Sequence, residues 1–183
     1  MFGDLHIHMI LDGVYYRAAI DAQKEHPLDG LVRARLSDYQ ARGVCLLRDG
    51  GDAWGVSLRA RELAGEYGID YRSPAFPIYR RGHYGAFIGR GFDTEDEYRA
   101  LLDEAGEKRA DFIKLMISGL IDFDHFGVLT EPGPEPQDIR RMIELAHAAG
   151  FAVMAHANGD RAAMAALQAG VDSIEHGAYL SES

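Results

Sequence analysis

The sequence predicts an α/β fold in which parallel strands alternate with helices. Short runs rich in Val, Ile and Leu alternate with longer amphipathic segments, this alternation occurs six times, and the turns from helix to strand are short. Parallel strands need crossover connections, so this order predicts a parallel sheet with helices outside it. At 183 residues the chain is long enough to bury a substantial core, and we expect one domain.

Six segments have the composition and length of strands. The first alternates apolar side chains with Asp4, His6 and His8. The six strands are expected at 2–8, 43–49, 69–76, 111–117, 151–157 and 171–176. The first strand therefore directs its two histidines to the same face of the predicted sheet.

Helices are expected between these strands, at 28–42, 54–67, 94–109, 135–149 and 159–169. Thr94 and Glu97 have the spacing of a capping box at the start of a helix. Apolar side chains in 135–149 recur at the helical period, and Gly150 follows as a C-terminal cap. Two long loops, 77–91 and 118–134, remain outside the helices and strands, and loops of this length are usually functional.

Composition excludes several classes of partner. The formal net charge is −10 and no basic run is present, so nucleic acid and anionic membranes are poor partners. No apolar stretch reaches the length of a membrane span, and the N-terminus lacks the features of a signal peptide, so we expect a cytoplasmic protein. Cys45, the only cysteine, lies in an apolar run and is predicted to be a buried structural thiol.

Four histidines lie near the ends of predicted strands. His6 and His8 end the first strand, and His156 and His176 lie near the ends of the fifth and sixth. The carboxyl ends of parallel strands lie at one face, where ligands bind. Lys114 is an unexpected charge within the apolar fourth strand, and a buried lysine needs a counter-charge, a lowered pKa or a chemical modification. Together these five residues indicate a metal site.

The remaining histidines fit this pattern less well. His83 and His125 lie in the two long loops and, with Tyr84, are candidate substrate contacts. His26 and His147 have no such position and are expected to be structural.

These motifs resemble those of the amidohydrolase superfamily of metal-dependent hydrolases. GDLHIH (3–8) is similar to the H-x-H motif of the family's first strand, and Lys114 in FIKLM matches the lysine of its fourth. His156 in MAHANG and His176 in SIEHGAYL match the histidines of strands five and six. The resemblance is strongest to imidazolonepropionase-like enzymes and Xaa-Pro dipeptidases. It implies a TIM-type (β/α)8 barrel, of which residues 1–183 supply about the first six β/α units.

The resemblance also implies a binuclear centre with two divalent metal ions, expected to be zinc. His6 and His8 would hold the more buried ion, His156 and His176 the more exposed one, and a carbamate on Lys114 would bridge them. The implied reaction is hydrolysis of an amide or peptide-like C–N bond by a metal-activated hydroxide. The expected substrates are dipeptides, N-acyl amino acids or cyclic amides. Asp4 faces the same way as His6 and is a candidate hydrogen-bond partner that would support His6 as a metal ligand.

Two features depart from the family pattern. No segment is available for the small β-sandwich that family members carry, and the chain ends after the sixth predicted strand. The aspartate that serves as general base in the family ends strand eight, so no catalytic residue is assignable; Asp49 and Asp122 are weak substitutes. Since an open barrel exposes strand edges, we expect that the chain is part of a longer one, is a cleaved or otherwise truncated product, or completes its barrel with another copy.

Two alternatives remain open at this stage. The first is a mononuclear deaminase or cyclic-amide hydrolase in which Lys114 is unmodified. The second is a metal-binding fragment or interaction module without activity, because strands seven and eight are missing.

Overall fold

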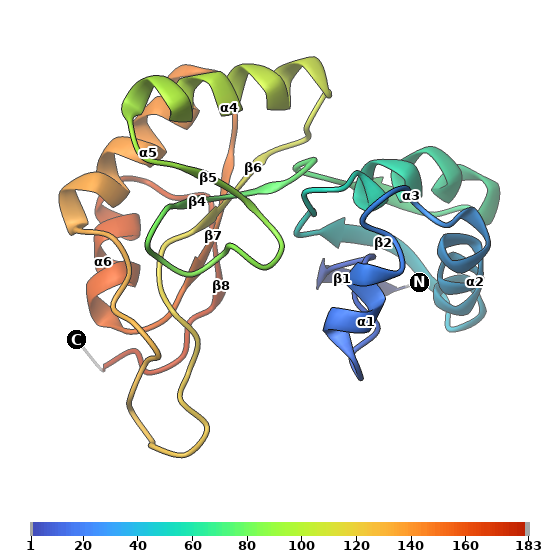
Figure 1. Cartoon of the computed structure of the whole chain (residues 1–183), viewed down its shortest axis with the longest axis horizontal. Helices are drawn as coiled ribbons and strands as arrows, with labels where there is room; N and C mark the ends of the chain where they lie inside the picture. Colours follow the sequence, from blue (N-terminus) through green and yellow to red (C-terminus); the bar gives the residue numbers. More distant parts are fainter. Residues whose placement is uncertain (1, 182–183) are drawn as a thin grey trace. The chain divides into compact units, whose positions relative to one another are not determined.

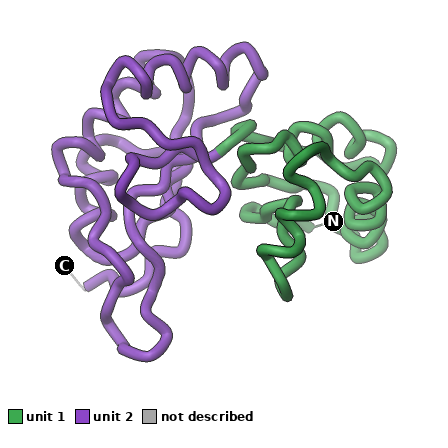
Figure 2. Tube along the Cα trace, viewed as in Figure 1, with its two compact units in different colours: residues 1–76 green, residues 77–183 purple. Residues whose placement is uncertain are grey.

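The computed structural model describes residues 2–181 of the chain. The backbone forms two compact units, Met1–Phe76 and Pro77–Ser183, which Figure 2 shows in green and purple. Each unit contains its own parallel sheet, and helices connect its successive strands except at 81–89 in the second unit, where a loop joins two neighbouring strands (Figure 1). The predicted α/β class with parallel strands is confirmed.

The first unit is a three-stranded sheet covered by helices. Its strands β1 (Phe2–Ile7), β2 (Val44–Asp49) and β3 (Asp70–Arg72) pair in that order, all in parallel. Helix α2 (Asp29–Ala41) connects β1 to β2, and α3 (Val56–Ala64) with the 3₁₀ turn Gly65–Tyr67 connects β2 to β3. Fully buried side chains of α2, β2 and α3 form its core, among them Val32, Leu36, Leu47, Val56 and Ala60. A short helix, α1 (Tyr16–Asp21), lies in the loop after β1 and was not predicted.

The second unit contains a five-stranded parallel sheet with the order β5-β4-β6-β7-β8. Its strands are β4 (Pro77–Arg80), β5 (Arg90–Phe92), β6 (Ile113–Met116), β7 (Val153–Ala157) and β8 (Ser173–His176). Three helices run along it: α4 (Glu95–Glu107), α5 (Pro136–Ala148) and α6 (Asp160–Gln168). Every residue of β6 and β7 is buried, as expected of central strands in a parallel sheet that is covered on both faces.

The third predicted strand is interrupted, so the expectation of one strand over 69–76 is wrong. β3 ends at Arg72, and β4 starts at Pro77, within a segment that was predicted to be a loop. Pro74 has no N–H to donate to a ladder, and Ala75 has a left-handed backbone with φ of 66°. β3 pairs with β2, whereas β4 pairs with β6, so the interruption coincides with the boundary between the two units.

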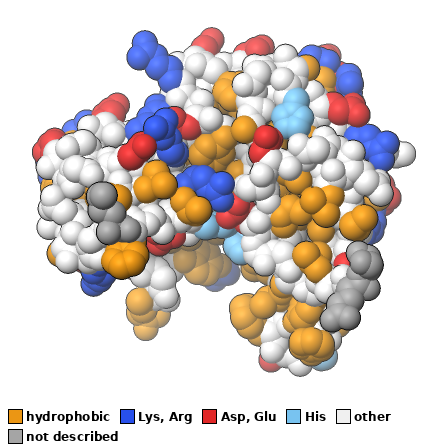
Figure 3. All heavy atoms as spheres, turned by 180° about the vertical axis from the view of Figure 1, so that it is seen from behind, with side chains coloured by type: hydrophobic (Ala, Val, Ile, Leu, Met, Phe, Trp, Pro, Cys, Tyr) orange, Lys and Arg blue, Asp and Glu red, His pale blue; other side chains and the backbone are white. Residues whose placement is uncertain are grey.

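The long loop after β6 contains a hairpin-like turn. Ile121 and Leu129 form an isolated antiparallel bridge, and the backbone of Thr130 is hydrogen-bonded to Leu120. The tip exposes large aromatic side chains, with Phe123 and Phe126 90% and 93% exposed. Figure 3 shows hydrophobic side chains gathered at this end of the second unit. Across residues 2–181, no helix has the length and apolarity needed to cross a membrane.

The capping box predicted at the start of the fourth helix is present. The Thr94 side chain accepts a hydrogen bond from the backbone N–H of Glu97 (3.2 Å), and Glu97 in turn accepts from the backbone of Asp93 (2.8 Å). Because the N–H groups in the first turn of a helix lack intrahelical partners, this side-chain oxygen stabilises α4.

We therefore predict that Thr94→Ala lowers the free energy of unfolding of the second unit by about 1 kcal/mol. Urea unfolding followed by circular dichroism measures the loss. Thr94→Ser, which keeps the hydroxyl, should retain most of the stability; an equal loss in both variants would show that the hydrogen bond is not the cause.

Candidate metal centre

His6 and His8 lie together at the end of the first strand. Their ring centroids are 5.5 Å apart, the rings are tilted by 56°, and both side chains are partly buried. The pair is therefore placed as the alternation of a strand predicts, with both imidazoles on the same side of β1.

His8 is oriented by the loop that follows the neighbouring strand. Its Nδ1 lies 3.0 Å from the carbonyl oxygen of Gly51, which can only accept, so Nδ1 carries the proton. The ring also lies against Gly50, where a Cβ atom would stand 2.4 Å from Cε1 of His8. Position 50 needs glycine because the imidazole occupies the space of a side chain.

Asp49, the last residue of β2, stabilises this loop through hydrogen bonds to its side chain. Its carboxylate accepts hydrogen bonds from the backbone of Met9 (3.0 Å), the backbone of Gly51 (2.6 Å) and the hydroxyl of Tyr71. The side chain is fully buried, and burial raises its pKa to about 6 despite the three hydrogen bonds, which lower it. Asp49 thus links the residue after His8 to the glycine that His8 contacts.

Lys114 and His156 lie on one face of the second sheet. Lys114 pairs in register with Met154, and Met116 pairs with His156, so alternation along β6 and β7 directs Lys114 and His156 to the same side. Lys114 is fully buried, and His156 is 2% exposed. The expectation of a buried lysine in the fourth predicted strand is confirmed.

His176 reaches His156 through an unusual backbone conformation. Register places it opposite Ala157, so regular alternation would direct its side chain to the other face of the sheet. Its φ is 70°, however, which is rare for a residue other than glycine. The chain is no longer extended at this residue, and its ring centroid lies 4.6 Å from that of His156.

His156 is oriented by a loop carbonyl, as His8 is. Its Nε2 lies 3.1 Å from the carbonyl oxygen of Gly119, so Nε2 carries the proton. Asn158 donates to the same oxygen (3.1 Å), and its backbone N–H donates to Ser118 (2.8 Å). Strand β7 and the loop after β6 are therefore fixed to each other at this histidine.

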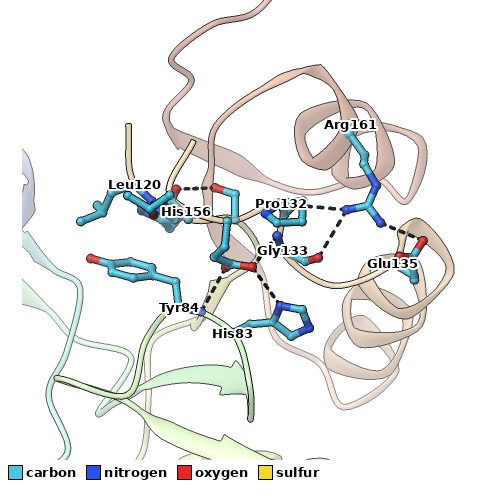
Figure 4. A network of polar contacts seen from close by, with 12 residues as sticks. His83, Tyr84, Leu120, Pro132, Gly133, Glu135, His156 and Arg161 are labelled. Atoms are coloured by element: carbon cyan, nitrogen blue, oxygen red, sulfur yellow. Dashed lines mark hydrogen bonds and ion pairs between the residues drawn. The ribbon is translucent and has the colours of Figure 1, made fainter. Parts of the chain in front are cut away.

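The candidate substrate contacts come from the two long loops. The ring of Tyr84 lies 5.0 Å from that of His156, measured between centroids, whereas His83 is turned away and engages Glu131 (Figure 4). His125 lies in the hairpin-like turn, where it contacts Asp122 of the same turn (3.2 Å) and is 71% exposed. Of the three, Tyr84 is the residue that lies against a predicted metal ligand.

The structure places the five predicted ligands in both units: His6 and His8 in the first, and Lys114, His156 and His176 in the second. Each unit brings its own two histidines together. Within residues 2–181, no three or more His, Cys, Asp or Glu side chains converge on a point suited to one ion.

Sequence reasoning missed two acidic residues near these histidines. Glu131 accepts three hydrogen bonds within the loop network, and Glu175, 7% exposed, pairs in register with His156 and so shares its face. Glu175 does not stand out in the sequence as Lys114 does, because the segment 171–176 (VDSIEH) also contains Asp172 and Ser173. No sequence pattern singles out Glu131, because two of its three partners, Tyr84 and His83, lie 47 and 48 residues away.

Comparison with known proteins identifies the family. The sequence profile of the amidohydrolase family matches residues 58–183, which is more than half of the chain. The chain therefore belongs to the amidohydrolase family. An ochratoxinase of Aspergillus niger is 28% identical over 144 residues, and the match covers 76% of this chain and 28% of that protein.

Solved structures show the same fold. The A. niger ochratoxinase superposes with a TM-score of 0.72 at 20% identity, over 98% of this chain and 48% of that one. A prolidase complexed with N-methylphosphonate-L-proline gives 0.70 at 24% identity, with the same two coverages. A Xaa-Pro dipeptidase gives 0.66 at 20% identity, over 95% and 47%. The chain thus spans about half the length of these proteins, and its β/α units form part of a TIM-type barrel.

We predict that Asp49 makes the first unit less stable as pH rises. Its folded-state pKa, about 6, lies above its ordinary value of 3.8, so the folded state favours the protonated form. The resulting contribution to the free energy of unfolding is full below about pH 4 and is lost as pH rises through 6. The loss is on the order of 3 kcal/mol. Urea unfolding followed by the fluorescence of Trp54, the only tryptophan, measures it in this unit.

Asp49→Asn removes the titrating carboxyl group and with it this pH-dependent contribution. The free energy of unfolding of the variant, relative to that of wild type, should therefore increase from pH 4 to pH 7. Asp70→Asn, at an exposed carboxylate of β3, is the matched control and should follow the wild-type profile. A constant difference between Asp49→Asn and wild type across this range would contradict the prediction.

Proposed function

We propose that this chain provides the metal ligands of a hydrolase that cleaves an amide or peptide-like C–N bond in a small substrate. The proposal rests above all on the two histidine pairs at the carboxyl ends of parallel strands, in each of which one ring is oriented by a loop carbonyl. A hydrogen bond of this kind fixes the tautomer of a histidine that binds a metal. Family membership supports the same chemistry.

The donor set fits divalent ions such as zinc. Two imidazoles that bind one tetrahedral Zn²⁺ through Zn–N bonds of about 2.0–2.1 Å have ring centroids about 5 Å apart. The observed separations, 5.5 Å for His6 and His8 and 4.6 Å for His156 and His176, lie on either side of this value. The protonated nitrogens assign Nε2 of His8 and Nδ1 of His156 to the metals.

Lys114 is the proposed bridging ligand, as a carbamate. A cationic ammonium is costly in a fully buried position on an apolar strand, and conversion to a carbamate gives an anionic ligand with two oxygen atoms. Glu175 on the same face favours a second candidate state, in which Lys114 stays protonated and is compensated by this carboxylate. That state corresponds to a mononuclear deaminase or cyclic-amide hydrolase.

When bound, the ions would polarise the scissile carbonyl and lower the pKa of a water molecule. The residues of this chain would hold the ions and shape the pocket. Tyr84, beside His156, would contact the substrate, and we retain His83 and His125 as candidate contacts from the same loops. The Xaa-Pro dipeptidase and the prolidase among the similar structures make dipeptides the first substrates to test, followed by N-acyl amino acids and cyclic amides.

We predict two zinc ions per chain after reconstitution, measured by elemental analysis of the dialysed protein. His156→Ala should lose at least one ion, because it removes a ligand held by Gly119. His26→Ala is the matched control, since His26 is exposed, and should keep both. Equal metal content in wild type, His156→Ala and His26→Ala would contradict the assignment.

We also predict a carbamate on Lys114. Zinc-loaded protein equilibrated with ¹³C-bicarbonate should show a carbamate carbon resonance that is absent from Lys114→Ala and present in Lys108→Ala, at a lysine on the helix surface. A zinc-loaded protein with one ion and no such resonance would favour the mononuclear alternative.

The hydrolysis test uses the zinc-loaded chain with dipeptides, N-acyl amino acids and cyclic amides, with products separated by mass spectrometry. Turnover that is lost in His156→Ala and retained in His26→Ala supports the proposed function. Two bound ions without turnover of any of these substrates would instead indicate a metal-binding module.

A further inference from the structure

Glu131 accepts hydrogen bonds from residues of two loops and has no part in the function proposed above; Figure 4 shows the polar network that contains its partners His83, Tyr84 and Gly133. Its carboxylate accepts from Nδ1 of His83 (3.0 Å), the backbone N–H of Tyr84 (3.1 Å) and the backbone N–H of Gly133 (2.7 Å). The side chains of Glu131 and His83 are only 25% and 27% exposed. One carboxylate therefore joins the loop after β4 to the loop after β6.

The electrostatic state of Glu131 agrees with this role. Partial burial raises its pKa, whereas the hydrogen bonds from His83, Tyr84 and Gly133 lower it, and the resulting pKa is below the ordinary value. An ionised carboxylate is an acceptor only, so Nδ1 of His83 must carry a proton. The sequence suggested His83 as a substrate contact, but its ring points away from His156 (Figure 4).

The loop after β4, which Glu131 binds, is tightly wound and places the ring of Tyr84 beside His156. Gly85 has φ of 133°, and a Cβ atom there would lie 2.6 Å from Cβ of Tyr79, so the loop packs closely on β4. Tyr84 precedes Gly85 in this loop. Its ring centroid lies 5.0 Å from that of His156 and 5.4 Å from that of Phe87. The backbone N–H of Tyr84 is the group that Glu131 binds.

The backbone of Glu131 also contacts Gly119, the residue that orients His156. The backbone carbonyl of Glu131 accepts from Gly119 (3.1 Å), and the carbonyl of Gly119 accepts from His156. A Cβ atom at Gly119 would lie 2.7 Å from the backbone of Glu131, so the two segments are in close contact. Glu131 therefore binds the backbone N–H groups of both Tyr84, whose ring lies beside His156, and Gly119, whose carbonyl orients His156.

We propose that Glu131 is a positioning residue: through its side chain it fixes His83 and the Tyr84 backbone, and so sets the place of the Tyr84 ring as a wall of the substrate pocket beside His156. His83 then serves as part of this connection. The proposal rests on the proposed function only for the statement that the pocket binds substrate. The connection itself is a property of the chain without metal.

The first test examines that connection in the metal-free chain. Long-range ¹H–¹⁵N correlation spectra above pH 8 should show the Nδ1–H tautomer for His83 in wild type. In Glu131→Ala the ring loses its acceptor, so the Nδ1–H tautomer should no longer predominate. In Glu131→Gln the amide oxygen should stay where it accepts from both His83 and Gly133, so the NH₂ group faces the backbone N–H of Tyr84 and the Tyr84 amide resonance should shift. Glu135→Gln, at a glutamate of the same loop that pairs with Arg161 at the surface, is the matched control and should preserve both.

The second test separates positioning from loss of the fold. Titration with Co²⁺, followed by its visible absorption, should give the same affinity within about twofold for wild type, Glu131→Gln and Glu135→Gln, because the histidine ligands remain. With the dipeptide or N-acyl amino acid turned over fastest in the hydrolysis test, Glu131→Gln should raise KM about tenfold and change kcat less than about threefold.

Tyr84→Ala should raise KM similarly, and adding Glu131→Gln to it should have little further effect, since the two residues act as one unit. An unchanged His83 tautomer in Glu131→Ala, an unchanged Tyr84 amide resonance in Glu131→Gln, or multiplicative effects in the double variant would overturn the proposal. If wild type binds metal but hydrolyses nothing, the proposed function fails, and the tautomer and Tyr84 resonances still decide whether Glu131 forms the connection.

Discussion

The parallel pairing of every strand is the constraint on which the rest of this structure depends. Parallel strands must be joined by crossover connections, so all the strands of one sheet end at the same edge. Five polar side chains of the candidate metal centre lie on or next to these strand ends, on β1, β6, β7 and β8. The central strands are fully buried, which leaves their carboxyl ends and the following loops as the places where polar chemistry is accommodated.

The two units use the same device to orient a histidine. In each, a glycine shortly after the end of the adjacent strand presents its carbonyl to the imidazole: Gly51 after β2 for His8, and Gly119 after β6 for His156. Each of these loops also has a glycine where a side chain would not fit. A Cβ atom would be too close to the ring of His8 at Gly50, and too close to the backbone of Glu131 at Gly119. The carbonyl binds Nδ1 in one unit and Nε2 in the other, so the two histidines differ in the nitrogen that would bind metal.

The loops differ from the strands in how their positions are determined. The histidines on strands are placed by backbone ladders, whereas Tyr84 is placed by one side chain, Glu131, from a distant loop. This arrangement lets loop contacts vary while the strand ends remain constant, which is how barrel enzymes change substrate without changing fold.

The sequence by itself determined the class of fold, the parallel direction of the strands, and the position of four histidines and a lysine on or next to them, because hydrophobic periodicity and strand alternation are local properties. It failed at the third strand, where Ala75 adopts a left-handed backbone and the ladder passes from one partner to another. Only the tertiary structure decided which nitrogen of His8 and His156 is protonated, how His176 turns toward His156, and that Glu131 holds Tyr84. These features depend on contacts between residues far apart in the chain, and no local pattern encodes such contacts.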